Sequence, residues 1–483
     1  MPNLPWVSLN FRIYATNMEA SSPSDKNAHP QTHKIGPFAV PSWILFDWAA
    51  QPFYTLITTF LFAPYFVNVV VGNEVAGQTI WGYSLSIAGL CVAILSPILA
   101  SVADVSGRRK PWIFAFFVLQ MIAMTALWFA APDSSSSLIM LLCIAFIISY
   151  ICAECSIVFT NAMMAYLVPE NQVGRLSGTG FAIGYLGGVM SLLIMLGLII
   201  PDPKTGMTLL SIEPIFSLDL LMREADRLVG PFSALWYLIF GLPLFLFTPD
   251  LTGPRKPLFK AASEGLAMLK GTLQNLWRDH RNITIFFFAR LFYIDGLTSV
   301  FAFGAIYATT IFAWGSIEQG LFGIILAIFG AIGAFIGGRF DDAIGPRRVL
   351  LITLCGLTLA VIGIISIDKN HIFFVFDIPA KEVGSGLFSS PGEQLYLAFA
   401  ILVGLVFGPI YASSRSLLVR LAPKDQMTEF FGLFAFSGKV TSFLSPFVIG
   451  TVTYLSSSQQ IGISMVLVFL TLGFVLLLWV KDR

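Results

Sequence analysis

The sequence predicts an all-α polytopic membrane protein with about twelve transmembrane helices in two pseudo-symmetric six-helix bundles. Three observations predict this fold class. Of the 483 residues, 56% are hydrophobic and only 11% are charged, whereas soluble globular proteins carry about a quarter charged residues. Windows of about 20 mostly apolar residues, enough to cross a bilayer as a helix, recur along the whole chain. The same loop motifs also appear in both halves of the sequence.

The apolar windows divide the chain into four parts. Residues 1–42 form a polar arm without the apolar core of a signal peptide, and we expect this arm to be flexible and cytoplasmic. An N-terminal bundle (43–248) and a C-terminal bundle (283–483) flank a cytoplasmic linker (249–282) that holds six basic residues. The twelve expected spans are 43–70, 79–103, 111–131, 138–166, 176–200, 230–248, 283–312, 318–340, 347–367, 394–421, 427–454 and 459–480.

The basic residues predict the orientation, because loops rich in lysine and arginine stay on the cytoplasmic side. With the N-terminus inside, the inside segments and both tails hold 21 of the 28 basic residues: three, three, one, six, three, three and two in chain order. The outside loops hold five, and Arg290 and Lys439 remain within spans. We therefore expect both termini to be cytoplasmic.

Several classes of function lack the residues that they require. All five cysteines fall in apolar segments, where thiols behave as small hydrophobes. Cys152 and Cys155 have the spacing of some metal sites, but no second pair or nearby histidine completes one, so we favour helix packing. No nucleophile motif or ATP-binding loop is present. We expect no enzyme, no cofactor, no metal and no nucleic-acid partner.

One loop motif follows the second span of each half. The segments 104–110 and 342–348 both read Asp, two residues, Gly and then paired arginines. Glycine permits a positive φ, and aspartate can meet a helix N-terminus or an arginine, so the motif can form a latch that gates transport. Alternatively, the arginines only obey the inside-positive rule. The candidate gating residues are Asp104, Gly107, Arg108, Arg109, Asp342, Gly345, Arg347 and Arg348.

A second motif precedes the fifth and eleventh spans. Pro169 is followed nine residues later by Gly178, and Pro423 is followed nine residues later by Gly432. Matching motifs in corresponding loops indicate that the two halves are copies of one helical bundle.

The Asp-x-x-Gly-Arg-Arg loop resembles the signature of the major facilitator superfamily. That signature begins with Gly four residues before the Asp, and this position is Ala100 in one half and Gly338 in the other. More specific motifs resemble the branch related to the fungal vacuolar amino-acid effluxers of autophagy and their bacterial relatives. These motifs are Trp43–Ala49, Gly174–Gly178, Gly184–Gly188, Ser414–Ser416 and Glu429–Gly432.

The resemblance implies two six-helix domains around a cavity that opens alternately to each side of the membrane. It implies a secondary transporter of small solutes, with amino-acid efflux as the activity of the fungal members. The short outside loops look more like a bacterial member, so we expect the bacterial inner membrane. A proton or Na⁺ gradient is the expected energy source, and we expect a monomer. A receptor or scaffold built on a carrier fold is the alternative, because fold does not fix function.

Ionisable side chains within spans are candidate functional groups, because each costs several kcal/mol unless it is paired or faces water. Those within the spans are Glu154, Arg290, Asp295 and Lys439, with Asp47 near the start of the first span. Asp295 has two interpretations: ion coupling, or a buried salt bridge to Arg290 or Lys439. Because Arg290 and Asp295 are five residues apart on one helix, we expect their partners on other helices.

Asp47 and Asp295 occupy loosely matching places in the two halves, so they are candidates for a carboxylate pair across the interface. Because Trp43 and Trp48 lie beside Asp47 in the sequence, however, we favour its interpretation as an anchor at the membrane surface. Polar residues in other spans can face a cavity or join two helices by hydrogen bonds. The candidates are Gln51, Asn161 and Tyr293.

Overall fold

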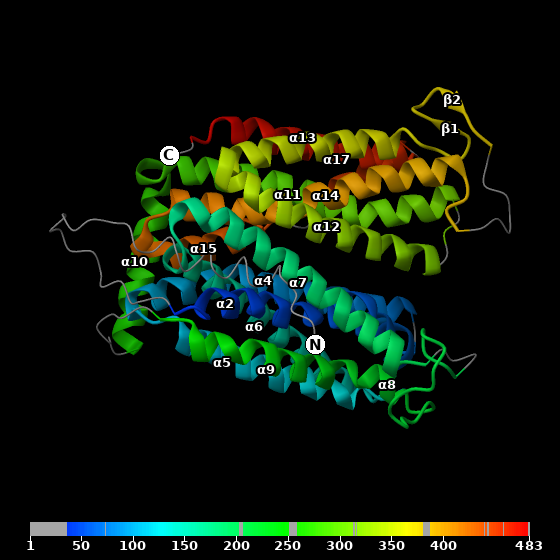
Figure 1. The fold of residues 1–483 in the computed structure, drawn as a ribbon, viewed down its shortest axis with the longest axis horizontal. Helices are drawn as coiled ribbons and strands as arrows, with labels where there is room; N and C mark the ends of the chain where they lie inside the picture. The colour runs from blue at the N-terminus through cyan, green and yellow to red at the C-terminus, as the bar shows by residue number, and fades with distance from the viewer. Residues whose placement is uncertain are drawn as a thin grey trace, which may run out of the picture.

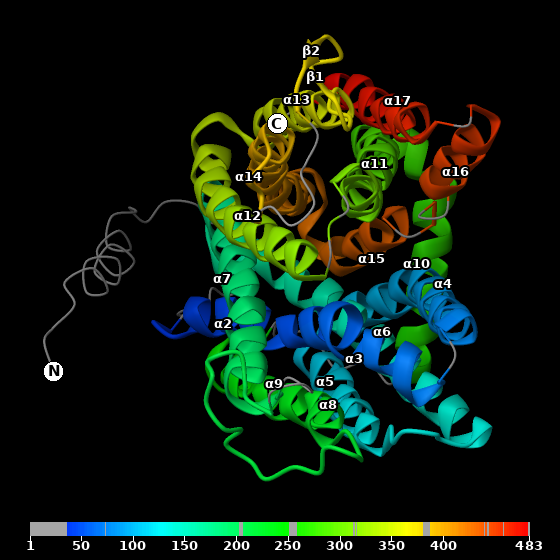
Figure 2. The same ribbon diagram turned by 90° about the vertical axis from the view of Figure 1, so that its right-hand side faces the viewer.

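The computed structural model describes residues 36–481, except 73, 202–205, 251–257, 313, 315, 380–386, 439, 442–443 and 457. It confirms the all-α polytopic fold, and the first and second halves of the chain form two bundles side by side (Figures 1 and 2). The N-terminal half contains α2 (Ala39–Pro52), η1 (Phe53–Phe60), α3 (Phe62–Tyr65), η2 (Phe66–Val70), α4 (Glu74–Ser106), α5 (Lys110–Ala126), η3 (Leu127–Phe129), α6 (Ser136–Leu167), η4 (Glu170–Gln172), α7 (Val173–Ile194), η5 (Met195–Ile199), α8 (Glu224–Arg227) and α9 (Val229–Phe247).

The linker and the C-terminal half are also helical, apart from one short hairpin. The linker forms an amphipathic helix, α10, which packs its buried face on α4. The remaining elements are α10 (Leu258–Asp279), α11 (Arg281–Phe312), α12 (Ser316–Ile344), α13 (Pro346–Ile365), β1 (His371–Ile372), β2 (Phe376–Asp377), α14 (Pro391–Leu421), η6 (Lys424–Gln426), α15 (Met427–Ser437), α16 (Leu444–Ser456) and α17 (Gln459–Leu478).

Ten helices among the described residues are long and apolar enough to cross a membrane. They correspond to ten of the twelve expected spans. The first expected span begins at Ala39 rather than residue 43, and it is divided into α2, the π-helix η1, α3 and η2. The change from α2 to η1 occurs at Pro52, because proline has no N–H to donate to the preceding turn. The eleventh span is divided into α15 and α16.

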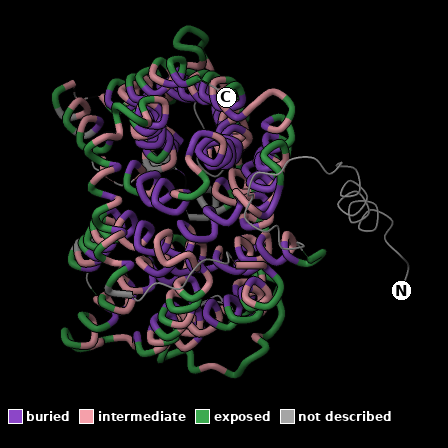
Figure 3. The backbone as a smooth tube through the Cα atoms, turned by 90° about the vertical axis from the view of Figure 1, so that its left-hand side faces the viewer, coloured by how far each residue is buried: buried purple, intermediate pink, exposed green. Residues whose placement is uncertain are grey.

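Burial follows the pattern of a protein solvated by lipid. Buried residues lie in the interior of each bundle and between the bundles, while exposed residues follow the outer rim (Figure 3). Many exposed positions on the spans are large and apolar, including Leu90, Ile122, Leu141 and Ile352. Such an apolar exterior is expected where hydrocarbon replaces water as the solvent.

The loop between α13 and α14 contains a feature that the sequence did not predict. His371–Ile372 and Phe376–Asp377 pair as a two-stranded antiparallel hairpin. The His371 ring lies between two carboxylates, with Nδ1 3.1 Å from Asp368 and Nε2 3.2 Å from Asp377. The His371 ring thus links the strand β2 to Asp368, which precedes the hairpin.

The most extensive contacts between the halves are those of α7 with α12 and of α4 with α15 (Figure 2). The glycines of the repeated Pro-Gly motif lie at these crossings. A Cβ on Gly178 would lie 2.8 Å from Gly338 Cα, and one on Gly432 would lie 2.7 Å from Pro97 Cα. Both positions therefore require glycine, because the backbones of the paired helices touch there.

Candidate functional site

A cavity of about 300 Å³ lies between the two halves. One wall comes from the first span and from α7, and the facing wall comes from α11, α12 and α14. The N-terminal wall carries Gln51, Thr55 and Thr59, which recur every four residues and therefore lie on one face of the helix. Gln51 thus lines the cavity, whereas the sequence left open whether it would face a cavity or join two helices.

A π-helix shapes the polar wall of the cavity. The hydroxyls of Thr58 and Thr59 donate to the carbonyls of Phe53 and Tyr54, five residues earlier, at 3.1 and 2.9 Å. π-Helical turns are rare and frequently occur at functional sites. Glycines of α7 let this segment approach closely, since a Cβ on Gly188 would lie 2.8 Å from Gln51 Cγ.

Below the cavity, α7 and α14 run antiparallel and meet in three successive layers. Tyr185 contacts Phe407 with ring centroids 5.7 Å apart, and Phe181 stacks on Tyr411 at 5.6 Å. One turn further along both helices, Ser177 meets Arg415. The aromatic layers close the floor of the cavity, and the Arg415 layer lies beyond them.

Arg415 projects from the C-terminal half into a polar site built by the N-terminal half. Its Nε donates to Ser177 Oγ at 3.0 Å, its Nη2 to the Ser177 carbonyl at 2.6 Å, and its Nη1 to Asn161 Oδ1 at 3.1 Å. The same Nη1 lies 3.5 Å from Asp47 Oδ2, and Phe181 covers the guanidinium. The planar fork of arginine thus contacts three helices of the other half at once.

This site corrects two interpretations of the sequence. Asp47 is not a surface anchor: it faces Arg415, and the neighbouring Trp43 is buried, with its indole N–H donating to the Thr160 carbonyl at 2.7 Å. The count of basic residues placed only Arg290 and Lys439 within spans, but Arg415 also lies inside a span, on α14, and is 7% exposed. The available signal was its position six residues before the end of an apolar span.

The end of the bundle that holds the turns 104–110 and 342–348, here called the basic end, is closed by two matching contacts. Asp104 Oδ2 accepts the backbone N–H of Glu429 at 2.8 Å, so the last turn of α4 caps the first turn of α15. Asp104 Oδ1 also pairs with Arg109 at 3.0 Å, and Arg109 donates to Thr428 Oγ1 at 2.5 Å. The carboxylate therefore sits at the positive end of a helix from the other half.

The second contact repeats the first with the halves exchanged. Asp342 Oδ2 accepts the backbone N–H of Arg175 at 3.0 Å, so α12 caps α7. Next to it, the buried Asp341 accepts from Ser416 and lies 3.5 Å from Arg420. The sequence pointed to Asp342 and missed Asp341, whose polar partners Ser416 and Arg420 lie in its own half and whose side chain packs on Gly174 of the other half.

The predicted turn glycines have the backbone that the motif requires. Gly107 has φ of 75° and Gly345 has φ of 91°. Of the paired arginines, Arg109 joins the contact between the halves, whereas Arg347 donates to the carbonyls of Leu477 and Leu478 within its own half. For Arg108 and Arg348, no side-chain partner is recorded among the described residues, and Arg348 is exposed.

Most of the chain matches a known protein family. Residues 64–483 match the family described as vacuole effluxer Atg22 like. The chain belongs to this family. It is 25% identical over 445 residues to the uncharacterized MFS-type transporter YxiO of Bacillus subtilis (strain 168), covering 92% of this chain and 94% of YxiO. It is 26% identical over 299 residues to autophagy-related protein 22 of Cryptococcus neoformans, covering 61% of this chain and 50% of that protein. The chain thus aligns with about half the length of the fungal protein.

Solved structures share the fold of this Atg22-like protein. The human organic anion transporter MFSD10 superposes with a TM-score of 0.63 at 15% identity, covering 91% of this chain and 98% of MFSD10. FucP in the outward conformation superposes with a TM-score of 0.64 at 14% identity, covering 93% and 99%. The chain is therefore a multi-pass member of the major facilitator superfamily, related to Atg22 and its bacterial relatives, and these relatives support membrane transport in general.

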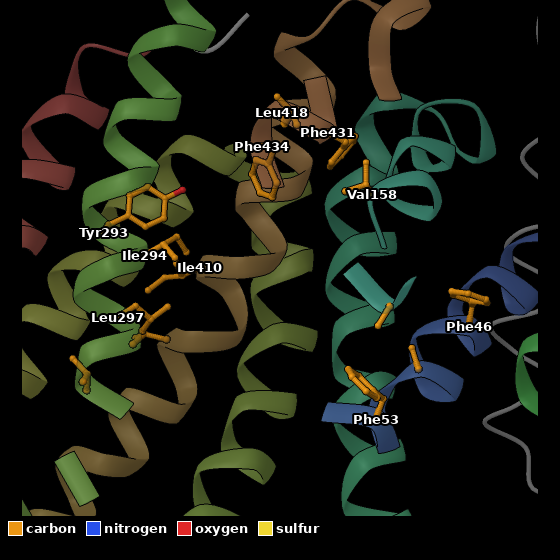
Figure 4. Close-up of a cluster of buried hydrophobic side chains, with 14 of the residues drawn as sticks. Phe46, Phe53, Val158, Tyr293, Ile294, Leu297, Ile410, Leu418, Phe431 and Phe434 are labelled. Carbon is orange, nitrogen blue, oxygen red and sulfur yellow. The ribbon is translucent and has the colours of Figure 1, made fainter. Parts of the chain in front are cut away.

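The remaining candidate residues of this Atg22-like protein lie around α11. Arg290 is buried, and its Nη1 donates to the Phe434 carbonyl at 2.6 Å and to Ser437 Oγ at 2.9 Å, both on α15. Its partners therefore lie on another helix, as expected. The Tyr293 hydroxyl and Ser414 Oγ share a hydrogen bond of 2.7 Å, which joins α11 to α14. Figure 4 shows Tyr293 with Ile294 and Leu297 in a cluster of buried hydrophobic side chains.

Two further candidate carboxylates are Asp295 on α11 and Glu154 on α6. Asp295 is 1% exposed, and no ion pair with Arg290 is recorded among the described residues. Both Asp295 and Glu154, which lies on α6 of the other half, are within electrostatic reach of Arg290, and Glu154 is also within reach of Tyr54. Lys439, the other candidate partner of Asp295, lies outside the described residues.

Proposed function

We propose that this Atg22-like protein is a secondary active transporter of small solutes that works by alternating access. The observation that carries this proposal is the asymmetry of the interface between the halves. A cavity lies on one side of the aromatic and Arg415 layers, and the capping contacts of Asp104 and Asp342 close the other side. A carrier needs an access path that is open at one end while the other is closed.

The orientation of this state follows from its charges. We take the basic end as cytoplasmic, with both termini inside, because positively charged loops are retained there. The cavity then belongs to an outward-open state of a protein in a bacterial inner membrane. The segments 43–248 and 283–483 would move as two units about the interface, with 249–282 as their cytoplasmic connection.

The capping contacts are the proposed gate. When the basic end opens, α15 and α7 each lose the carboxylate at their N-terminus, so these contacts stabilise only the closed state. We expect the double variant Asp104→Ala with Asp342→Ala to slow the switch between open states without abolishing solute binding. Turnover equal to that of the unmodified protein would leave these turns with a role in topology alone. Asp425→Asn, an exposed carboxylate of the same end, is the matched control.

Coupling to a proton or Na⁺ gradient is assigned to the buried carboxylates. Asp295 is fully buried, and Asp47 sits between the halves, so either can change its protonation or its partner as the halves move. We expect Asp295→Asn to insert and fold normally but to transport without dependence on a pH gradient. Proton-driven uptake or efflux that is unchanged in this variant would remove Asp295 from the mechanism.

Reconstitution tests the function itself. The purified protein in liposomes, energised by a pH or Na⁺ gradient, is expected to accumulate or release a small solute, with amino acids and uncharged solutes tested side by side. A sealed, correctly inserted protein that moves no solute in either direction would favour the alternative, a receptor or scaffold on a carrier fold. Mass measurement in detergent is expected to show a monomer.

A further inference from the structure

The two walls of the cavity differ in chemistry. The first span contributes the amide of Gln51 and the hydroxyls of Thr55 and Thr59. The Thr59 hydroxyl already donates to Tyr54, so it offers a solute a free acceptor lone pair. This wall can therefore satisfy a few hydrogen-bonding groups along one edge of a solute.

The facing wall is apolar. Phe301 and Phe407 lie against each other with ring centroids 4.6 Å apart, and Ile324, Leu326 and Ala327 of α12 continue the surface. Gly323 leaves space beside Phe60, whose ring a Cβ would approach to 3.3 Å. Aromatic and aliphatic walls of this kind bind flat apolar faces, and about 300 Å³ is at the small end of ligand pockets.

No described residue that lines the cavity is charged. Of the described charges near the cavity, Asp47 faces Arg415 beneath the aromatic floor, and Glu154 lies within electrostatic reach of Tyr54 and Arg290. An amino acid brings an ammonium and a carboxylate, and an unpaired charge in such surroundings costs several kcal/mol.

We propose that this cavity selects an uncharged solute with an apolar or aromatic face and one hydrogen-bonding edge, and that it discriminates against free zwitterionic amino acids. This inference rests on the proposed carrier function and names the solute class of the same site. The apolar face would lie on Phe301 and Phe407, and the polar edge would face Gln51 and Thr55.

Matched pairs of probes test the proposal. Tryptophan and phenylalanine are compared with N-acetyltryptophanamide and N-acetylphenylalaninamide, which keep the rings and remove both charges. Binding to the full-length detergent-purified protein is measured by thermal shift, since a ligand stabilises the state that it binds, and by equilibrium dialysis. We expect the amides to raise the unfolding temperature and to bind about tenfold or more tightly than the amino acids, a difference of about 1.4 kcal/mol.

Substitutions locate the binding to this cavity. Thr55→Val and Gln51→Leu should weaken binding of the amides, whereas Thr125→Val, whose hydroxyl bonds the Met121 carbonyl on the exposed side of α5, should not. Amino acids that bind as tightly as their amides, or amides that do not bind, would overturn the proposal. Transport of a charged amino acid in liposomes would overturn the solute class and keep the carrier function. Binding of the amides without transport of any solute would keep the solute class and overturn the carrier function.

Discussion

Arg175 and Glu429 occupy equivalent positions in the two halves, six residues after Pro169 and Pro423, but their side chains carry opposite charges. Each donates its backbone N–H to an aspartate of the other half, at 3.0 Å to Asp342 and at 2.8 Å to Asp104. The Arg175 guanidinium lies 3.7 Å from Asp342 and strengthens its contact. The Glu429 carboxyl is fully buried near Asp104, so like charges oppose each other at the second contact.

The Asp104 contact can therefore be strengthened by one substitution. Glu429→Gln removes the like charge and keeps the backbone N–H that Asp104 accepts, so we expect the basic end to stay closed for longer. The expected shift is on the order of 1 kcal/mol, about a fivefold change in population. Spin labels at the exposed Glu170 and Lys424, one in each half, report the distance across this end. A broader or longer distance distribution in Glu429→Gln would contradict the argument.

The Arg415 site predicts strong coupling between two charges. Arg415→Gln leaves Asp47 buried without its cation, and losing one partner of a buried pair costs about 3–5 kcal/mol. Asp47→Asn in the same protein should recover much of that loss, because no uncompensated charge remains. The apparent unfolding temperatures of the unmodified protein, the two single variants and the double variant form a double-mutant cycle. Additive losses would show that the two residues do not interact.

The crossing of α7 and α12 predicts a steric effect at Gly178. A Cβ there would lie 2.8 Å from Gly338 Cα, so Gly178→Ala should force the helices apart and open the basic end. Gly89→Ala is the control, because a Cβ at that helical position meets nothing within 4 Å. The same spin-label distance is measured for both. A closed basic end in Gly178→Ala would mean that the crossing adjusts without separating the halves.

The hairpin between α13 and α14 should respond to acid. Burial raises the pKa of Asp368, but hydrogen bonds from the N–H groups of Asn370 and His371 and from the His371 ring more than offset this, so its pKa lies below the usual value. A depressed folded pKa stabilises the hairpin above the unfolded pKa, and this contribution is lost as pH falls through the folded value, below about 4. Hydrogen-exchange protection at Asn370 and His371 should fall there. In Asp368→Asn, protection at these two amides should show no such step.

Much of the architecture could be predicted from local patterns. Apolar windows located the spans, and the repeated Asp and Pro-Gly motifs indicated two related halves. The structure brings those motifs together: Gly178 packs on α12, and Gly432 packs on α4. The divided first span was harder to predict, because a π-helix and an α-helix share the same apolar composition.

The candidate site was predicted less completely than the fold. Asp47 and Asn161 were singled out by their chemistry, but their shared partner, Arg415, lies more than 250 residues away in sequence. Trp43 beside Asp47 suggested a membrane surface, a suggestion that the buried indole contradicts. Sequence spacing describes neighbours on one helix, whereas these contacts depend on how two bundles meet.

The sequence by itself determined that the chain crosses a membrane many times, that its halves repeat, and that aspartates follow the second span of each half. These properties depend on composition and on spacing along single helices. Only the tertiary structure decided which helix N-terminus each aspartate caps, where Arg415 inserts, and that a cavity without charged lining lies above it among the described residues. Such contacts are set by packing between distant segments, and no local pattern encodes them.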